Sequence, residues 1–408
     1  MLVLRRLLRN WEESSMVEWK NLWEVTTWDK KFSGVDNFMQ PKVIKYHYYL
    51  ANELSELENE NGNIRILYTT EKVAYANALD VESNVSEGEV VAIPWGGNPS
   101  IKYYKGKFIT ADNRIATSND TNVLGNKYLY YWMFSKLNVI AGFYRGAGIK
   151  HPSMLSVLKM QIPIPSKSEQ ERIVSILDTF TASIANLKEQ IKERRKQYEH
   201  YRDQLLDLEG KEGVEMKTLG EIFSFKNGLN KGKDYFGKGK LIIMFSNVFN
   251  SRYIDSTMLK NRVDINNNEL ERINANKGDV FFTRTSETKE DVGYASVLLE
   301  DIKECTFAGF LIRARPILNV FIPEYCKYCF STQKVRESIV CRSSFTTRAS
   351  LTGNGLGKVE IPIPPKQTQS RIVSILDQFE ASIANLEAQL KEREKQYEYY
   401  RNQLLTFE

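Results

Sequence analysis

The sequence contains one long segment twice. Residues 161–206 and 360–405 align without a gap at a separation of 199 residues, and 33 of their 46 positions are identical. A repeat of this length is far too long for the units of a solenoid or a propeller. It predicts two domain-sized units, each ending in the repeated segment, and a molecule with pseudo-two-fold symmetry.

Each copy of the repeat predicts one long helix. Its apolar residues alternate in spacing between three and four, which produces the narrow stripe of a coiled-coil seam. The principal seam residues are Ile173, Leu177, Phe180, Ile184, Leu187 and Ile191 in the first copy, and Ile372, Leu376, Phe379, Ile383, Leu386 and Leu390 in the second. We predict helices of roughly 37–40 residues, or about 55–60 Å at 1.5 Å per residue.

The segments before the two helices set where the helices begin. Both contain Ile-Pro-Ile-Pro, at 162–165 and 361–364, and we expect extended chain there because proline disfavours the α conformation in the preceding residue. Ser168 with Glu171 is the predicted cap of the first helix, and Thr368 that of the second.

The two seams match almost residue for residue, which favours pairing of the helices with each other. A two-fold axis across the seam makes the pair antiparallel and places one globular domain at each end. Packing of each helix on its own domain remains the alternative. Arg194 and Arg393 fill the same gap in the two seams, where they could fix the register or extend to the surface.

Composition and segment pattern favour an α/β or α+β fold in the globular parts, with short strands rich in Val, Ile, Phe and Tyr between Gly, Asn, Asp and Ser turns. The predicted segments are an N-terminal arm (1–16), a first globular domain (17–160), a first helical spacer (161–210), a second globular domain (211–359) and a second helical spacer (360–408).

The net charge of +5 permits a nucleic-acid partner. Four cysteines and no long apolar run indicate a cytoplasmic protein without membrane spans.

Motifs for catalysis or metal binding fail their context tests. Two residues separate Cys326 from Cys329, but the usual second pair of zinc ligands is missing. In the other half of the chain their positions hold Leu129 and Trp132, so we expect both cysteines to be apolar residues of a helix. The glycines of 353–357 follow no strand and precede no helix, as a dinucleotide site would require. We therefore predict no catalytic residue, metal or cofactor in this chain.

Basic, aromatic and hydroxyl side chains interleaved with glycines provide the candidate nucleic-acid contacts, since such residues bond phosphates and base edges. In the first half these are Trp95, Asn98, Lys102, Tyr104, Lys107, Asn113, Arg114 and Arg145. In the second half these are Lys226, Asn227, Lys231, Lys233, Arg284, Thr285, Ser286, Thr288, Lys289, Arg342, Ser344, Thr347 and Arg348. Each run also fits a solvated loop or hairpin, but their placement at equivalent points of both halves favours contact.

The chain resembles the specificity subunits of type I restriction-modification enzymes. The resemblance rests on Ile-Pro-Ile-Pro followed by RIVSILD and KQYE in each repeat, on the alternation of globular domain and helix, and on GDVFFTRTSET at 278–288. It implies that the domains at 17–160 and 211–359 are target-recognition domains. Each would read one half of a split, asymmetric duplex DNA sequence, and the helices would be the spacer between them.

The resemblance also implies the partners. Two methyltransferase subunits, which bind S-adenosylmethionine and methylate adenine at N6, would dock on the helices. Two restriction subunits can join them and cleave unmodified DNA with ATP and Mg²⁺. This chain would be non-catalytic. A coiled-coil scaffold with two protein-binding domains is the alternative, and a self-contained modification enzyme is a third hypothesis. Within the N-terminal arm, LRRLLRNWEE at 4–13 is loosely similar to YRDQLLDLEG at 201–210, so we expect the arm to imitate the end of a repeated helix.

Overall fold

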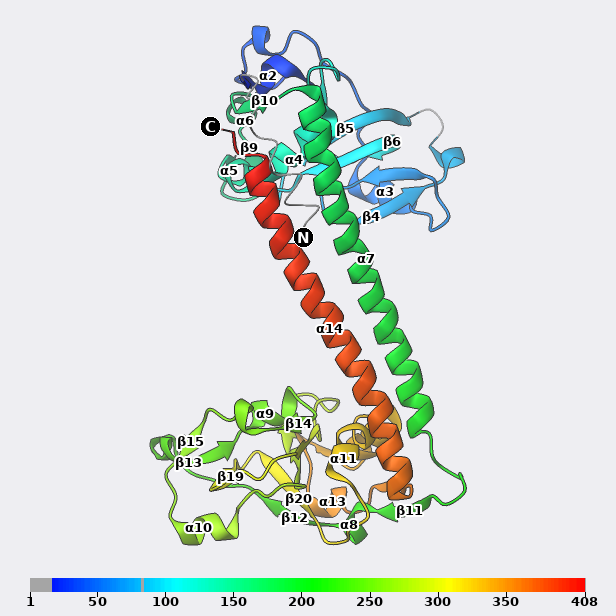
Figure 1. Ribbon diagram of the computed structural model, residues 1–408, viewed down its shortest axis with the longest axis vertical. Helices are drawn as coiled ribbons and strands as arrows, with labels where there is room; N and C mark the ends of the chain where they lie inside the picture. The colour runs from blue at the N-terminus through cyan, green and yellow to red at the C-terminus, as the bar shows by residue number, and fades with distance from the viewer. Residues whose placement is uncertain (1–16, 82–83, 408) are drawn as a thin grey trace. The chain divides into compact units, whose positions relative to one another are not determined.

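The computed structural model describes residues 17–81 and 84–407. The chain divides into two compact units (Figure 1). Unit 1 contains the residues up to Leu187 and those from Gln389 onward, and unit 2 spans Lys188–Ala388. Each unit thus holds one globular part and a portion of each long helix. The predicted N-terminal arm, residues 1–16, lies outside the described residues.

Unit 1 is built around a six-stranded sheet. Its strand order is β2 (Thr26–Trp28), β7 (Asn113–Ser118), β5 (Ser86–Pro94), β6 (Lys102–Thr110), β3 (Ile64–Leu67) and β4 (Val73–Ala76). Neighbouring strands are antiparallel except β3 and β6, which are parallel. The apolar helix α4 (Asn126–Ser135) buries Leu129 and Trp132 in one core with Val91 and Ile93 of β5.

Shorter elements complete the globular part of unit 1. They are β1 (Glu18–Asn21), α2 (Leu22–Val25), η1 (Asn37–Met39), α3 (Ala51–Glu56), η2 (Ala78–Asp80), α5 (Leu137–Ala141), β8 (Tyr144–Arg145), β9 (His151–Pro152), α6 (Met154–Leu158) and β10 (Gln161–Ile164).

Unit 2 repeats this mixed architecture with different strands. Its five-stranded sheet has the order β12 (Phe223–Asn227), β20 (Leu311–Pro316), β16 (Val280–Thr283), β18 (Ala295–Leu298) and β14 (Tyr253–Ile254). Two three-stranded sheets are β15 (Arg262–Val263), β13 (Phe236–Ile243) and β19 (Cys305–Phe307), and β17 (Thr285–Ser286), β22 (Ala349–Ser350) and β21 (Ser344–Phe345). The mixture of helices and strands in both units confirms the predicted α/β or α+β class.

Short helices surround these sheets. They are α8 (Leu219–Ile222), η3 (Lys233–Tyr235), α9 (Phe245–Phe249), η4 (Ser256–Met258), α10 (Asn267–Arg272), α11 (Pro323–Cys329), α12 (Gln333–Cys341) and α13 (Gly353–Leu356). On α11, Cys326 and Cys329 are 3% exposed and belong to the main core of the unit. The prediction that they are apolar residues of a helix is confirmed.

The chain around each proline segment pairs in the same way in both units. In unit 1, β1 is antiparallel to β10, with Glu18 opposite Ile164. In unit 2, β11 (Glu215–Thr218) is antiparallel to β23 (Glu360–Ile363), with Glu215 opposite Ile363. Each proline segment is therefore an extended strand, as predicted, in a two-stranded sheet where a missing N–H is tolerated.

Two helices of the predicted length follow these strands. Helix α7 (Lys167–Leu206) has 40 residues and α14 (Lys366–Leu404) has 39. Both predicted caps are wrong, the first by two residues and the second by three. Ser166 Oγ accepts the N–H of Glu169 at 3.3 Å, which starts α7 ahead of Ser168, and Thr368 lies inside the first turn of α14.

The seams of the two helices meet in both units. In unit 1, Ile173 and Leu177 share a core with Leu404, and the ring of Phe180 stacks on Tyr400 with centroids 5.4 Å apart. In unit 2, Tyr201 stacks on Phe379 at the same 5.4 Å.

The helix direction can be read within unit 2 alone. Arg195 pairs with Glu387 at 2.6 Å, and the Tyr198 hydroxyl donates to Glu380 at 3.1 Å. Numbers that rise along α7 therefore meet numbers that fall along α14, and the pairing is antiparallel as predicted.

The arginines in the seam gaps lie against aromatic rings. The guanidinium carbon of Arg194 is 5.8 Å from the ring centroid of Phe379 in unit 2, and that of Arg393 is 5.7 Å from Phe180 in unit 1. Both distances fall within the range of cation–π attraction. These arginines thus cover the aromatic rings of the seam, and a role in fixing the register stays a prediction.

A buried glutamine joins each helix start to its globular part. In unit 1, the side chain of Gln170 accepts the N–H of Gly125 and donates to the carbonyls of Val123 and Pro165, all at 2.8–3.0 Å. In unit 2, Gln369 makes the same three bonds, with Ile322, Val320 and Pro364, at 2.7–2.9 Å. The two glutamines are 1% and 0% exposed, so each satisfies three backbone groups in a dry site.

Candidate nucleic-acid interface

In unit 1, the loop after β5 lies against the β8–β9 hairpin. The N–H of Trp95 donates to the carbonyl of Asp112 at 3.0 Å, and the N–H of Gly97 donates to Lys150 of the hairpin at 3.1 Å. His151 Nδ1 donates to the carbonyl of Trp95 at 2.8 Å, and the two rings lie 5.0 Å apart. We call the loop 95–98 together with the hairpin 144–152 interface 1.

In unit 2, the chain after β16 makes the corresponding contacts. The N–H of Arg284 donates to Phe310 at 2.8 Å, and the N–H of Leu351 donates to Arg284 at 2.9 Å. Strand β17 pairs with β22, and β22 pairs with β21. The runs 283–289 and 342–348, which are far apart in the sequence, therefore share one small sheet. We call 284–289 together with the hairpin 342–350 interface 2.

The two interfaces occupy equivalent places. Each interface begins where a buried central strand ends. A backbone hydrogen bond joins it to the residue just before another strand of the same sheet, Asp112 before β7 or Phe310 before β20. Each interface also lies against a hairpin that follows a pair of short helices. The residues at these places differ between the units, although the helices α7 and α14 are nearly identical. This is the arrangement expected for two readers of different sequences on a repeated frame.

Most exposed residues of both interfaces carry hydrogen-bond donors. In interface 1 the exposed residues include Asn98, Arg145, Lys150 and His151, with Trp95 half-buried beside them. In interface 2 they are Glu287, Thr288, Lys289, Arg342, Ser344, Phe345, Thr346, Thr347 and Arg348, with Arg284, Thr285 and Ser286 half-buried. Arginine and amide groups bond base edges in the major groove, and hydroxyls and lysines bond phosphates.

One acidic side chain, Glu287, offsets part of the positive charge of interface 2. Glu287 Oε1 lies 3.6 Å from Arg348 Nη2, and both side chains are exposed. An exposed pair of this kind contributes little to stability, so Arg348 can exchange Glu287 for a DNA phosphate or a guanine edge at small cost.

The structure corrects two candidates of the first half. Asn113 and Arg114 on β7 are both 0% exposed. Asn113 Nδ2 donates to the carbonyl of Leu67 at 2.8 Å, and Arg114 Nη1 pairs with Asp29 at 2.9 Å. These side chains are occupied inside the protein, so neither is kept as a direct DNA contact.

Arg114 instead packs against Trp95 on the buried side of interface 1. Its guanidinium carbon lies 4.9 Å from the ring centroid of Trp95, and a second bond joins it to Asp112. Burial and the nearby Asp29 raise the pKa of Asp112, whereas His151 opposes this rise. The buried guanidinium of Arg114 therefore holds the indole ring of Trp95 in place within the loop 95–98.

Three candidates on β6 lie in different surroundings. Lys102 is mostly buried and donates to the carbonyl of Tyr68, and burial lowers its pKa to about 8. Tyr104 packs edge-on against Phe108. Lys107 is exposed. Lys102 lines a cavity of about 350 Å³ with tyrosines and charged residues, namely Arg65, Tyr68, Tyr103, Lys127, Tyr130 and Asp178 among others.

The basic loop of unit 2 starts beside interface 2. The N–H of Gly228 donates to Leu311 at 3.2 Å, next to the turn at Phe310 that Arg284 contacts. Along this segment Lys226, Asn227 and Lys233 are exposed. Lys231 pairs with Glu269 at 2.6 Å, and that bond raises its pKa. The loop can therefore supply positive charge to interface 2, mainly from Lys226 and Lys233, for which no ion pair is seen among the described residues.

Sequence reasoning missed several residues of the interfaces. Ile149, Lys150 and His151 complete the hairpin of interface 1. Phe345 is exposed in interface 2, and Phe310 is exposed beside it. A signal was present in Gly146-Ala-Gly-Ile149-Lys150, where an apolar residue and a lysine follow a turn-forming run. The pairing of this hairpin with the 95–98 loop had no sequence signal.

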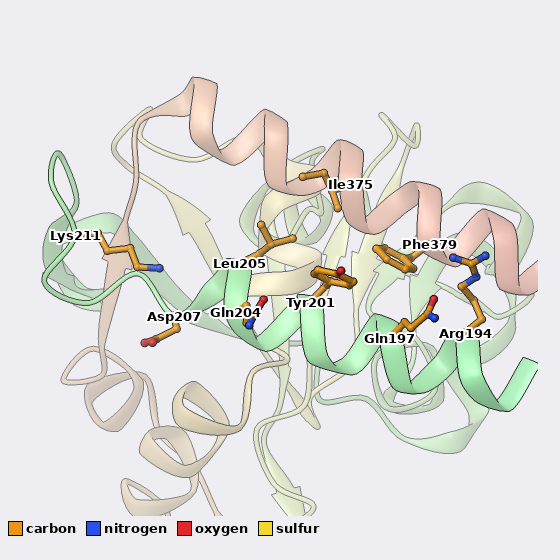
Figure 2. Close-up of a pocket in the computed structure, with 9 residues that line it drawn as sticks. All are labelled: Arg194, Gln197, Tyr201, Gln204, Leu205, Asp207, Lys211, Ile375 and Phe379. Atoms are coloured by element: carbon orange, nitrogen blue, oxygen red, sulfur yellow. The ribbon is translucent and has the colours of Figure 1, made fainter.

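A second candidate surface is a groove of about 970 Å³ in unit 2. It is lined by Arg194, Gln197, Tyr201, Gln204, Leu205, Asp207, Lys211, Ile375 and Phe379. Figure 2 shows Tyr201 and Phe379 side by side between the helices, with Arg194 beyond Phe379. Tyr201 is 46% exposed. The lining residues from the repeat recur in unit 1 as Arg393, Gln396, Tyr400, Gln403, Leu404, Ile176 and Phe180.

Other types of site are missing from the described part of the chain. Between 17 and 407, apart from 82–83, no cluster of three or more His, Cys, Asp or Glu side chains could hold a metal ion. Within the same residues no helix has both the length and the apolar character needed to cross a membrane.

These features define a two-unit recognition protein with a repeated helical frame. The family described as "Type I restriction modification DNA specificity domain" matches residues 42–194 and 211–395. The chain belongs to this family, and the resemblance noted from the sequence is confirmed.

Two curated relatives are similar over most of the chain. The EcoR124I/EcoR124II specificity subunit of Escherichia coli is 32% identical over 318 residues, which cover 72% of this chain and 74% of that protein. A putative type I restriction enzyme specificity subunit of Haemophilus influenzae is 28% identical and is matched over 99% of both chains.

A solved structure shares the fold. The S subunit of a type I restriction-modification system from M. genitalium aligns with a TM-score of 0.59 at 16% identity, and the alignment covers 97% of this chain and 98% of that one. At this level of identity the likeness concerns the fold alone.

Proposed function

We propose that this chain is the subunit that recognises a bipartite, asymmetric duplex DNA sequence for a type I restriction-modification complex. The segments 17–160 and 211–359 are the target-recognition domains, and interfaces 1 and 2 read one half-site each. The observation that carries this proposal is the pair of interfaces built at equivalent places from different side chains, on helices that are nearly identical.

The chemistry belongs to partner subunits. In this proposal two methyltransferase subunits, which hold S-adenosylmethionine, methylate adenine at N6, and restriction subunits with ATP and Mg²⁺ can join them in the cytoplasm. The chain supplies recognition and no catalytic residue. Because N6 of adenine is not accessible inside the base stack, the partner must extrude the base that this chain has selected.

The groove between α7 and α14 is the proposed dock for the methyltransferase subunit on unit 2. Tyr201 and Phe379 offer a flat aromatic surface, and Arg194 and the glutamines offer hydrogen bonds at its edge. Aromatic residues and arginine are the side chains that most often dominate binding energy at protein interfaces. Seven of the nine lining residues belong to the repeat and recur in unit 1, which supports a second copy of the partner there.

Modified-base sequencing of the host genome, with and without this gene, tests the recognition role. We expect deletion to remove one split, adenine-methylated motif, and the wild-type gene to restore it. Restoration with Arg284→Ala should relax only one half of the motif. An unchanged methylome in cells that express the partner genes would overturn the proposal and favour a protein-binding scaffold.

Co-purification tests the dock. Tyr201→Ala should weaken binding at this dock about tenfold for a loss near 1.4 kcal/mol. Because the dock of unit 1 is unchanged, the recovered methyltransferase subunit should fall from about two copies per chain towards one. Tyr235→Ala is the matched control, because Tyr235 of unit 2 is also 46% exposed and is not among the residues that line the groove. Equal recovery with both variants would remove this groove from the contact.

A further inference from the structure

Each interface carries one strongly exposed apolar side chain on its hairpin. Ile149 in interface 1 is 70% exposed, and Phe345 in interface 2 is 53% exposed. The hairpins are equivalent, since β8–β9 follows α4 and α5, and β21–β22 follows α11 and α12. Burying such a side chain would release about 1.5–3 kcal/mol, so finding one at the same place in both units indicates a contact with a partner.

The positive charges around Ile149 and Phe345 indicate which kind of partner they contact. Arg145 and Lys150 flank Ile149, and all three are exposed. Arg342 and Arg348 flank Phe345, and Glu287 is paired with Arg348. An apolar tip between cations matches the duplex, whose phosphates lie on either side of an apolar base stack. A protein partner with an apolar pocket would not need cations on both sides.

Both tips are held by backbone contacts. Phe345 pairs with the buried Ala349 in the β21–β22 ladder, and Ser344 Oγ donates to the carbonyl of Ser350 at 3.3 Å. The side chain of Ile149 lies over Gly96, where an added Cβ would come within 2.8 Å of its Cγ2 atom. Ile149 therefore lies close against the backbone of Gly96, and the tip stands on a braced hairpin.

We propose that Ile149 and Phe345 are wedges that enter the base stack of the duplex, one at each half-site. The inference rests on the proposed recognition of DNA. Isoleucine and phenylalanine are among the side chains that proteins insert between base steps, which unstacks and kinks the duplex. A wedge beside the recognised bases lowers the energy needed to extrude the adenine that the partner methylates.

Phe310 is 61% exposed and lies near interface 2, but it is not part of this proposal. The corresponding turn in unit 1 holds Asp112, which bonds Trp95 in the way that Phe310 bonds Arg284. The apolar character is thus shared between the units only at the hairpin tips.

The experiment uses the full chain in complex with its methyltransferase subunits and duplexes that contain the motif found by methylome sequencing. One 2-aminopurine is placed at successive steps flanking each half-site, and both fluorescence and binding affinity are measured. We expect binding to raise the fluorescence at one step beside each half-site by about threefold or more, as unstacking does. Phe345→Ser should abolish the rise at one half-site, and Ile149→Ser the rise at the other.

The controls are exposed apolar residues outside the interfaces. Leu79→Ser in unit 1 and Ile317→Ser in unit 2 replace residues that are 79% and 57% exposed, and both should retain the full fluorescence rise. Circular dichroism checks that all four variants fold.

The outcomes separate the two proposals. Failure of the wild-type complex to bind the motif would overturn the recognition role itself. Tight binding with no fluorescence rise at any step, or a rise that survives both wedge substitutions, would overturn the wedge alone. A contact with a thymine methyl group is also distinguished, because replacing thymine by uracil would then weaken wild-type binding as much as the serine variants do, and that result would count against a wedge.

Discussion

Arg114 and Asp29 form an ion pair in which neither side chain is exposed, with Nη1 and Oδ2 2.9 Å apart. The carboxylate also accepts the N–H of Ile115 at 2.9 Å and the hydroxyl of Tyr48 at 2.7 Å. A buried carboxylate with three donors tolerates a charge that would otherwise be costly to bury. The pair thereby joins β7 to the chain after β2 and places Arg114 under Trp95.

Loss of this arginine should destabilise unit 1. Arg114→Met leaves the Asp29 charge buried without its cation, and we expect the free energy of unfolding to fall by roughly 3–5 kcal/mol. Urea denaturation followed by circular dichroism measures the change. Addition of Asp29→Asn should restore part of the loss, because it removes the unpaired charge. A loss below about 1 kcal/mol would contradict a buried pair.

Arg145 is the matched contrast, because it is the exposed arginine of the same interface. Arg145→Ala should leave stability within about 0.5 kcal/mol of wild type. It should weaken binding of the complex to its motif by roughly 1–3 kcal/mol and relax one half-site. Lys159→Ala, an exposed cation outside both interfaces, should do neither. Unchanged binding and selectivity with Arg145→Ala would remove this residue from the reading surface.

The contrast between these two arginines shows what the sequence could and could not predict. The repeat, the seam spacing and the proline segments are local patterns, and each correctly predicted its element: two helices of about forty residues, their antiparallel pairing, and the extended strands before them. Arg114 has no local pattern. Its partner lies 85 residues earlier and reaches it only because β2 and β7 are neighbours in the sheet.

The same reason explains what was missed in the site. The runs 283–289 and 342–348 were chosen by composition, and nothing in either run specifies that β17 and β22 pair. Gln170 and Gln369 did have a sequence signal, because both copies of the repeat carry glutamine at the same position near the helix start. The three backbone groups that each glutamine bonds could not be predicted, since they are brought together only by the folded chain. The caps were placed too late because Ser166 precedes the more obvious Ser-x-x-Glu pattern.

Arg284 and Arg348 are predicted to read the second half-site. Each lost base contact should cost about 1–3 kcal/mol at one position of the motif, so Arg284→Ala and Arg348→Ala should each broaden that half-site alone. Methylome sequencing of strains that carry each variant measures the effect. Arg262→Ala is the control, since this exposed arginine of unit 2 bonds only the carbonyl of Gly239 in the described structure. Retention of the full motif by both variants would contradict their role.

The buried glutamine of unit 2 should be a large contributor to stability. Gln369→Leu leaves the N–H of Ile322 and two carbonyls without partners in a dry site, and unsatisfied buried groups cost about 1–3 kcal/mol each. We expect a fall of roughly 2–4 kcal/mol in the free energy of unfolding, measured with urea. Gln378→Leu, on the exposed face of the same helix, should change it by less than about 0.5 kcal/mol. Equal effects of the two substitutions would contradict the inferred role of Gln369.

The last prediction concerns pH and Lys102. Burial lowers its pKa in the folded chain to about 8, below the ordinary lysine value of 10.5. Between these two values the unfolded chain binds more protons than the folded chain, so the contribution of Lys102 to the free energy of unfolding increases as pH rises. Urea denaturation at several pH values, for wild type and Lys102→Met, isolates this contribution.

The stability of wild type relative to Lys102→Met should therefore increase from about pH 7 to about pH 10. Lys107→Met is the control from the same strand. Because Lys107 is exposed, its difference from wild type should stay constant over this range. A difference for Lys102→Met that is flat or falls with pH would mean that Lys102 stays charged in the cavity, and that the tyrosines and carboxylates around it compensate its desolvation.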